Sequence, residues 1–130
     1  MNKLTAIISS IATEEQISII KSKIGSHTLS AMLLDISPEL SAGDSIALFF
    51  KENEVMLGSV TSKVSARNAF ISTIKEVEIG KLLCSVSVDF EDFIVTSIIT
   101  KESYEKLELS VGREVLWFVK SNEVSIQILH

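Results

Sequence analysis

Hydrogen-bond donors gather at three places in the second half of the chain. Ser65–Asn68 reads SARN, Thr100–Ser103 reads TKES, and Lys120 is followed by Ser121. A tetrahedral dianion presents only acceptor oxygens, so a site for it needs donors and positive charge and no facing carboxylate. These residue types therefore indicate an anion site, in which Arg67 and Lys120 supply the charge.

Each of these groups also has an ordinary structural explanation. Thr100 is placed to cap a following helix, which puts Ser103 near the third helical position and leaves free amides that attract anions. The same two residues could equally be a capping pair that binds nothing. Lys120, matched by Lys51, could be an edge-strand charge against aggregation. Arg67 could be a solvated linker residue, so the spacing alone leaves both interpretations open.

Residues for catalysis are scarce. The two imidazoles, His27 and His130, fit no Ser–His–acid arrangement, and the five glycines form no phosphate-binding loop. Cys84 shares an apolar face with Val86 and Val88, which predicts a buried small hydrophobic residue and not a nucleophile. We therefore expect a binding protein, not an enzyme, with no cofactor and no directly ligated metal cation.

Length and composition narrow the function further. The 130 residues are 46% hydrophobic, and 12 basic against 17 acidic residues give a net charge of −5. This excludes a disordered chain, and apolar runs of at most five residues exclude a membrane-spanning helix. An acidic chain is also a poor candidate for binding nucleic acid. Without a convincing targeting segment, a cytoplasmic protein is expected.

The sequence contains an internal repeat. Residues 40–57 and 109–126 are identical at eight of 18 positions with an offset of 69, and residues 4–11 match 70–77 with an offset of 66. The chain therefore predicts two tandem modules, 1–62 and 65–130. The first is shorter between Leu34 and Leu40, with a stub at Ser37–Leu40 in place of a helix.

The second module predicts five short strands and one helix. A final hairpin is expected to turn at Ser121–Asn122. The ranges are strands at 70–78, 83–90, 93–100, 113–120 and 123–129, with a helix at 101–107. This order predicts a mainly β fold of two tandem OB-like five-stranded barrels, each with at most one short helix. Several strands are apolar on both faces, so their outer faces should pack against another module or subunit.

The order of motifs resembles a known family. The segment SARNAFISTIKEVEIG, followed by ITKESYEKLELSVGREVLWFVKSNEVSI, is similar to the molbindin (Mop) module of the TOBE superfamily, and the whole chain resembles di-Mop molbindins. The resemblance implies a cytoplasmic homo-oligomer, dimer or trimer, that holds molybdate or tungstate at interfaces between modules or subunits. It implies these ligands: Ser65, Ala66, Arg67, Asn68, Thr100, Ser103, Lys120 and Ser121.

The first module departs from this pattern. It lacks Ser-Ala-Arg, Leu34 replaces the threonine, and Asp35 would disfavour a dianion. Lys51 is a possible secondary ligand. We expect this module to provide packing, or one wall of a site that another chain completes.

Three functions follow as hypotheses. The first is an intracellular molybdate-binding protein for storage and homeostasis. The alternative is a molybdate-sensing effector module that acts with, or derives from, a transcription regulator or transporter ATPase. The third, single-strand nucleic-acid binding by an OB-like fold, needs exposed stacking aromatics. Phe90 and Trp117 sit at positions predicted to be core, so we expect no nucleic-acid partner.

Overall fold

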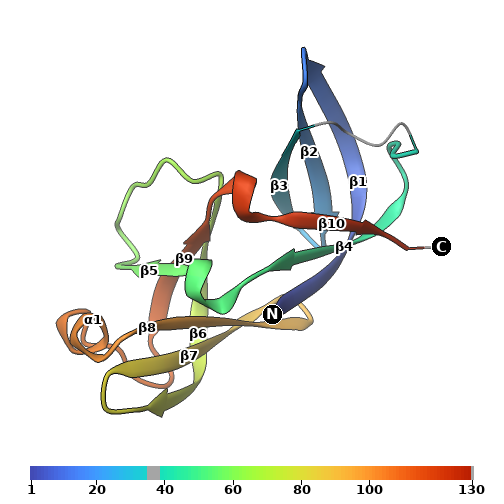
Figure 1. The fold of residues 1–130 in the computed structure, drawn as a ribbon. Coiled ribbons are helices and arrows are strands. Elements are labelled where there is room, and N and C mark those ends of the chain that lie inside the picture. Colours follow the sequence, from blue (N-terminus) through green and yellow to red (C-terminus); the bar gives the residue numbers. More distant parts are fainter. Residues whose placement is uncertain (35–38, 130) are drawn as a thin grey trace.

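The computed structural model describes residues 1–34 and 39–129. Within these residues the chain forms two five-stranded antiparallel sheets and one short α-helix (Figure 1). The first sheet contains β1 (Asn2–Glu14), β2 (Ile17–Ile24), β3 (His27–Leu34), β4 (Ser45–Phe50) and β10 (Ser125–Ile128). The second contains β5 (Met56–Gly58), β6 (Asn68–Ile79), β7 (Leu83–Phe90), β8 (Phe93–Thr100) and β9 (Glu114–Val119). The helix is α1 (Lys101–Lys106), and two 3-10 helices are η1 (Glu52–Glu54) and η2 (Ser121–Glu123).

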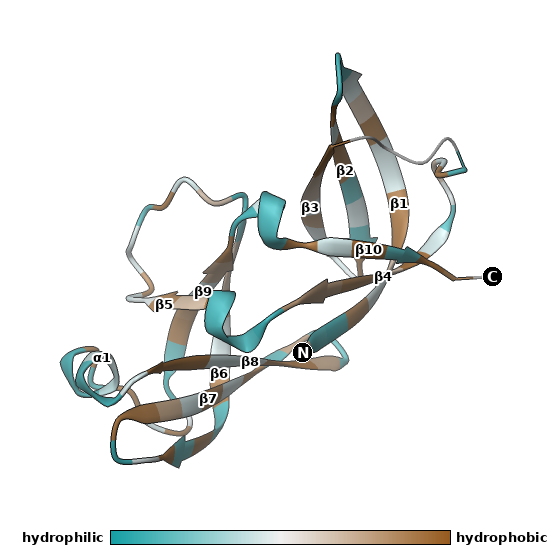
Figure 2. Ribbon diagram, viewed as in Figure 1, coloured by the Kyte–Doolittle hydropathy of each residue, from teal (hydrophilic) through white to brown (hydrophobic). Residues whose placement is uncertain are grey.

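The alternation of apolar and polar residues sets which face of each strand is buried (Figure 2). In β7, Cys84, Val86 and Val88 are buried while Asp89 is exposed, as the pattern predicted. A β-bulge interrupts β1 between Ile8 and Ser10, and another interrupts β6 at the matching position of the repeat. Bulges of this kind increase local twist and bend the strand.

The last strand of each half lies in the sheet of the other half. The order of the first sheet is β10-β4-β1-β2-β3, and that of the second is β5-β9-β6-β7-β8. The predicted hairpin of the last two strands is therefore wrong. A tight hairpin needs positive φ at its turn, but Ser121–Glu123 forms the 3-10 helix η2, which carries the chain across to β4.

One hydrophobic core spans both halves. Trp117 of β9 is fully buried and its ring lies 6.0 Å from that of Phe50, which belongs to the first half. The rings of Phe70 and Phe90 each lie 5.1 Å from Trp117. The predicted fold class is confirmed: a mainly β chain with two five-stranded sheets and one short helix. The repeat boundaries at 1–62 and 65–130 stay a prediction about the sequence, because each sheet takes one strand from the other repeat.

Some features that the sequence singled out cannot be placed. Asp35 and His130 lie outside the described residues, as do Ser37 and Pro38, the first two residues of the predicted stub at Ser37–Leu40. Within the described ranges, no helix is long and apolar enough to cross a membrane.

Deleting residues 125–130 tests the strand exchange. The deletion removes β10 and leaves one edge of β4 unpaired, whereas β9 keeps both neighbours, β5 and β6. We expect faster amide hydrogen exchange in β4 and unchanged exchange in β9, measured by mass spectrometry. A β9–β10 hairpin would give the opposite result, with protection lost in β9.

Candidate anion-binding site

Thr100 and Ser103 form the cap of α1. The backbone N–H of Ser103 donates to Thr100 Oγ1 (3.1 Å), and the Thr100 hydroxyl donates to Ser103 Oγ (2.9 Å). This confirms the predicted N-cap, and both residues are exposed. The hydroxyl hydrogen of Ser103 is not used within this pair. The cap therefore offers a ligand one hydroxyl donor together with the partial positive charge of a helix start.

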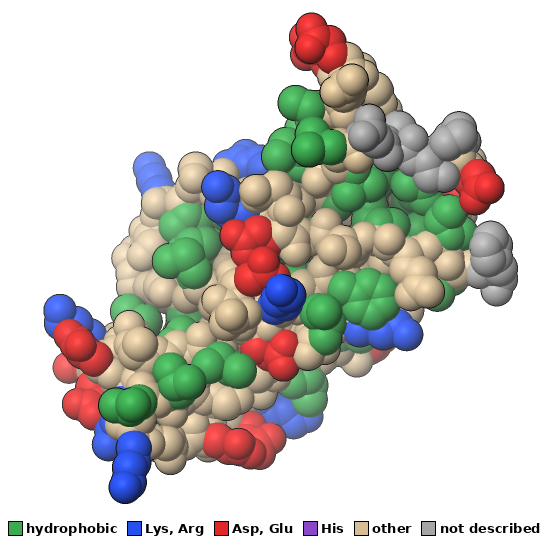
Figure 3. Space-filling view, viewed as in Figure 1, with side chains coloured by type: hydrophobic (Ala, Val, Ile, Leu, Met, Phe, Trp, Pro, Cys, Tyr) green, Lys and Arg blue, Asp and Glu red, His purple; other side chains and the backbone are tan. Residues whose placement is uncertain are grey.

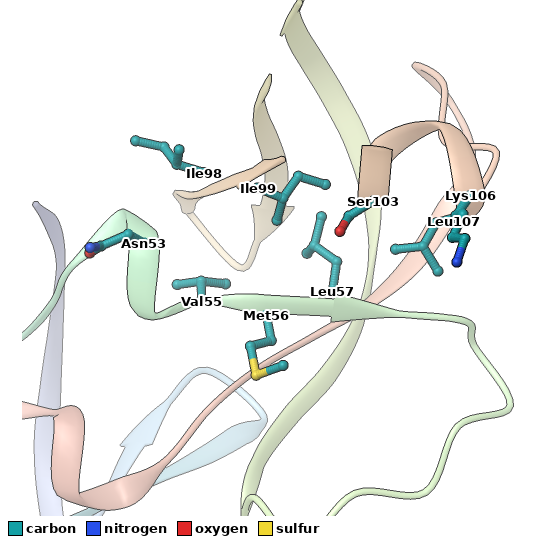
Figure 4. A pocket seen from close by; sticks show the side chains of 9 residues that line it. All are labelled: Asn53, Val55, Met56, Leu57, Ile98, Ile99, Ser103, Lys106 and Leu107. Carbon is teal, nitrogen blue, oxygen red and sulfur yellow. The ribbon is translucent and has the colours of Figure 1, made fainter. Parts of the chain in front are cut away.

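Ser103 also borders a hollow between α1 and β5 (Figure 4). Most of the hollow is apolar, with Val55, Leu57 and Ile99 among its lining residues. Figure 4 shows the Ser103 hydroxyl close to Leu57, and Lys106 beside Leu107 on the same side of the hollow as Ser103. A dianion enclosed by such a wall would lose hydration without enough compensating hydrogen bonds. The cap is therefore a partial site at the rim of an apolar hollow.

Arg67 and Lys120 lie at one end of the second sheet. The register pairs Asn68 of β6 with Val119 of β9. Arg67, which precedes Asn68, and Lys120, which follows Val119, are therefore neighbours. Both side chains are exposed, and neither forms a salt bridge with any described residue. Two cations that form no salt bridge with the described residues thus lie at one end of this sheet.

The structure does not bring the two groups of predicted ligands together. Arg67 precedes the first residue of β6, whereas Thr100 pairs with Leu83, beyond the turn that ends β6. Ala66 and Arg67 line one hollow, Thr100 a second and Ser103 a third. Figure 1 shows α1 and the start of β6 well separated. One described chain thus supplies two incomplete halves of the predicted donor set.

Asn68 has a structural role in the contact between the halves. Its buried side chain accepts a hydrogen bond from Ser30 N (2.7 Å) and donates one to Ser30 O (2.8 Å). Asn2, at the same position of the first repeat, makes the matching pair of bonds with Thr96 of β8. Each carboxamide satisfies backbone groups on the edge strand of the opposite sheet. Any contribution of Asn68 to a ligand must come through its backbone.

A pair of glutamates lies near Lys120. The side chain of Glu54 in η1 interacts with that of Glu123 in η2. A hydrogen bond with Glu54, then burial and mutual repulsion, raise the pKa of Glu123, while Lys120 opposes this shift. Figure 3 shows acidic side chains with basic ones beside them over the middle of this face. The cation at Lys120 therefore has negative charge nearby once both carboxyls are ionised.

The remaining predicted ligands are peripheral. Ser65 is exposed before β6, and Ser121 is half-buried at the start of η2. Lys51 is exposed at the start of η1, where its backbone N–H donates to Glu54 Oε1 (3.0 Å). The predicted ligand set therefore contains side chains that differ widely in their access to an ion.

Comparison with known proteins identifies the second half. Residues 64–126 match the TOBE domain. The second half of this chain is therefore similar in sequence to a TOBE domain. All eight ligands that the sequence predicted, from Ser65 to Ser121, lie inside it, whereas Lys51 and His27 lie outside.

Two relatives extend this result. Over 72 residues, 55% of this chain, the sequence is 33% identical to the molybdenum transport protein ModE of Azotobacter vinelandii. The chain spans 27% of the length of that protein. The structure also superposes on the cytoplasmic molybdate-binding protein ModG, in a crystal form with molybdate bound, with a TM-score of 0.91. That match covers 98% of this chain and 96% of ModG at 24% identity, which establishes a shared fold.

The role of Asn68 in the TOBE domain can be tested by Asn68→Ala. The change leaves the buried N–H and C=O of Ser30 without partners, so it should lower the free energy of unfolding by about 2–3 kcal/mol in urea titrations. Asn2→Ala should cost a similar amount through Thr96. The exposed Asn53→Ala should change stability by only a few tenths, about 0.3 kcal/mol. A loss for Asn68→Ala no larger than that control would contradict the assigned role.

Proposed function

We propose that this chain binds molybdate, or the closely similar tungstate, in the cytoplasm and holds it at interfaces between copies of the chain. The observation that carries the proposal is the pair of cations, Arg67 and Lys120, at one sheet end of a TOBE domain, without salt-bridge partners among the described residues. The likeness of this chain's fold to that of a molybdate-binding protein supports molybdate as the ligand. The task would be storage and homeostasis of the anion, without catalysis.

One chain supplies the predicted donor set in two separate parts, which supports a homo-oligomer, dimer or trimer. Arg67 and Lys120 supply charge at one place, whereas the hydroxyl donors of the α1 cap lie at another. A second copy that sets its cap against the cations of the first would complete a shell of donors around one ion. Charge-assisted hydrogen bonds of this kind contribute roughly 1.5–3 kcal/mol each. The two places together supply the predicted charges of Arg67 and Lys120 and the predicted hydroxyl of the α1 cap.

Exposed apolar side chains beside Thr100 are consistent with such an interface. Ile79, Leu82 and Leu83 are 59%, 80% and 56% exposed, at and just after the end of β6. Leu82 and Leu83 line a hollow together with Thr100. Contiguous apolar groups on a surface are typical of sites of protein contact. Burying them against another copy would also remove water from around the cap, which strengthens its hydrogen bonds.

The double variant Arg67→Ala/Lys120→Ala tests the site. Removing both charges should weaken molybdate binding at least 100-fold in isothermal titration calorimetry, because a dianion then lacks counter-charges. Lys21→Ala/Lys23→Ala removes the same net charge from exposed positions of β2 and should leave the affinity within about twofold.

The oligomeric state needs a second measurement on the same variants. Native mass spectrometry with and without molybdate reports the number of chains and of bound ions. Unchanged affinity in the Arg67/Lys120 variant would reject these ligands. A monomer that binds molybdate at full strength would reject the interface.

Glu123→Gln tests the neighbouring carboxylates. The change removes one negative charge close to Lys120 and keeps a group that can hydrogen-bond to Glu54. Molybdate affinity should rise about threefold, the effect of one partly screened charge. The pKa of Glu123 is raised, so the gain appears at pH values above that pKa and vanishes below it, where the wild-type carboxyl is already neutral.

The control for this change is Glu76→Gln, which removes one charge from an exposed position of β6. Its affinity should match that of the wild type at every pH. Equal gains from the two variants would show that overall charge, and not the Glu54–Glu123 pair, modulates binding.

A second candidate function is a molybdate-sensing effector module that works with a transcription regulator or a transporter ATPase. The similarity to part of the molybdenum transport protein ModE favours it. Storage requires several ions per oligomer, whereas sensing requires binding to a regulator that depends on the ligand. The number of ions from native mass spectrometry and a pull-down with and without molybdate therefore separate the two functions.

A further inference from the structure

A hollow beside the SARN segment is lined by three side chains that carry or can carry positive charge. Lys63 and Arg67 come from the loop before β6, and His27 is the first residue of β3 in the other half of the chain. Phe70 and Leu116 line its apolar part. The volume, about 790 Å³, far exceeds that of one tetrahedral oxyanion. Another surface must therefore cover an ion held there, as the proposed interface requires.

The imidazole of His27 is held in place by the second half. Its Nδ1 lies 2.6 Å from Glu91 Oε1, in the turn between β7 and β8. The same oxygen accepts hydrogen bonds from the backbone N–H and the hydroxyl of Ser26, both at 3.2 Å. The ring packs at 5.2 Å from Phe70 and 4.9 Å from Phe90. His27 is thus a fixed wall of the hollow.

The contact with Glu91 determines what the other ring nitrogen can do. The hydrogen bond from His27, followed by that from the Ser26 N–H, lowers the pKa of Glu91, so this carboxylate is ionised near neutral pH. An ionised carboxylate only accepts hydrogen bonds, so Nδ1 carries a hydrogen. Nε2 of the neutral ring then carries a lone pair, which repels an anion. Protonation turns Nε2 into a donor and gives the ring a positive charge.

We propose that His27 is a further ligand of the oxyanion, contributed by the half of the chain that lacks the SARN motif, and that it binds the ion as an imidazolium. Binding at Arg67 is then coupled to the uptake of one proton by His27. This inference rests on the proposed function. The sequence offered no signal for it, because His27 lies outside every motif of the TOBE domain.

The charges around His27 give the coupling its direction. On the hollow side lie the positive charges of Lys63 and Arg67. On the other side lies the carboxylate of Glu91, with Lys23 and Asp92 around a separate hollow that Glu91 lines. A dianion between the cations offsets their repulsion, so it favours the imidazolium. Affinity should therefore fall as the pH rises.

The repeat supplies the matched variant. Phe93 occupies the position of His27 in the second half, at an offset of 66, so the fold accepts an aromatic ring without nitrogens there. His27→Phe keeps the ring contacts and removes the titration. His27→Gln is a second, polar variant in case packing is disturbed. His130→Gln controls for the other imidazole of the chain.

The experiment is calorimetry of the full chain with sodium molybdate between pH 6.0 and 8.5, in two buffers of different ionisation enthalpy. For the wild type we expect uptake of a fraction of one proton per ion and a three- to tenfold fall in affinity between pH 6.0 and pH 8.5. His27→Phe and His27→Gln should bind three- to tenfold more weakly at pH 6.0, match the wild type at pH 8.5 and take up no proton. His130→Gln should behave as the wild type.

The outcomes separate this inference from the proposed function. If both His27 variants keep the wild-type pH slope and proton uptake, the inference is overturned while the proposed function stands. If the wild-type chain binds no molybdate at any pH, the proposed function fails and the inference fails with it. Thermal unfolding of each variant at each pH ensures that weak binding reflects the site and not loss of the fold.

Discussion

The exchange of β5 and β10 between the two sheets is the constraint on which the other features depend. Because each half contributes its last strand to the other, neither sheet closes without the whole chain. The exchange draws Phe50 and Trp117 into a single core. It also brings the edge strands β3 and β8 within reach of Asn68 and Asn2, whose carboxamides satisfy backbone groups that have no partner strand. Unpaired edges would otherwise be open to association with other strands.

The two halves share their fold but differ in the residues that could bind an anion. Each half has an asparagine, Asn2 or Asn68, bonded to the edge strand of the other sheet, and each contributes one glutamate to the Glu54–Glu123 pair. The SARN segment belongs to the second half, and among the described residues so does the α-helix, which Thr100 caps. The first half supplies His27 where the second has Phe93, so the hollow at Arg67 is basic, whereas Glu91 and Asp92 line its counterpart. A half of the chain that does not bind an ion of its own can therefore contribute a side chain to the hollow of the other half.

The sequence predicted the strands better than their partners. Alternation in β7 and the apolar run of β8 fixed both ranges, and Thr100 was recognised as a cap, because these signals are local. The strand exchange was missed because periodicity specifies which face of β10 is buried and not which strand lies beside it. The same limit applies to the site: the order of Arg67 and Thr100 along the chain carries no information about their separation in space. The match between Asn2 and Asn68 in the repeat was the signal that could have pointed to their hydrogen bonds with the opposite sheets.

A site divided between copies links binding to assembly. A net charge of −5 acts weakly over distance, since physiological salt screens charges beyond about 8 Å, so the local balance at Arg67, Lys120 and the Glu54–Glu123 pair decides whether a dianion stays. In the proposed oligomer the hydroxyl donor of one copy lies against the cations of another, so each bound ion would stabilise the contact. By reciprocity the contact would raise the affinity for the ion by the same free energy. The apolar residues beside Thr100 would then also exclude water from the hydrogen bonds to the anion.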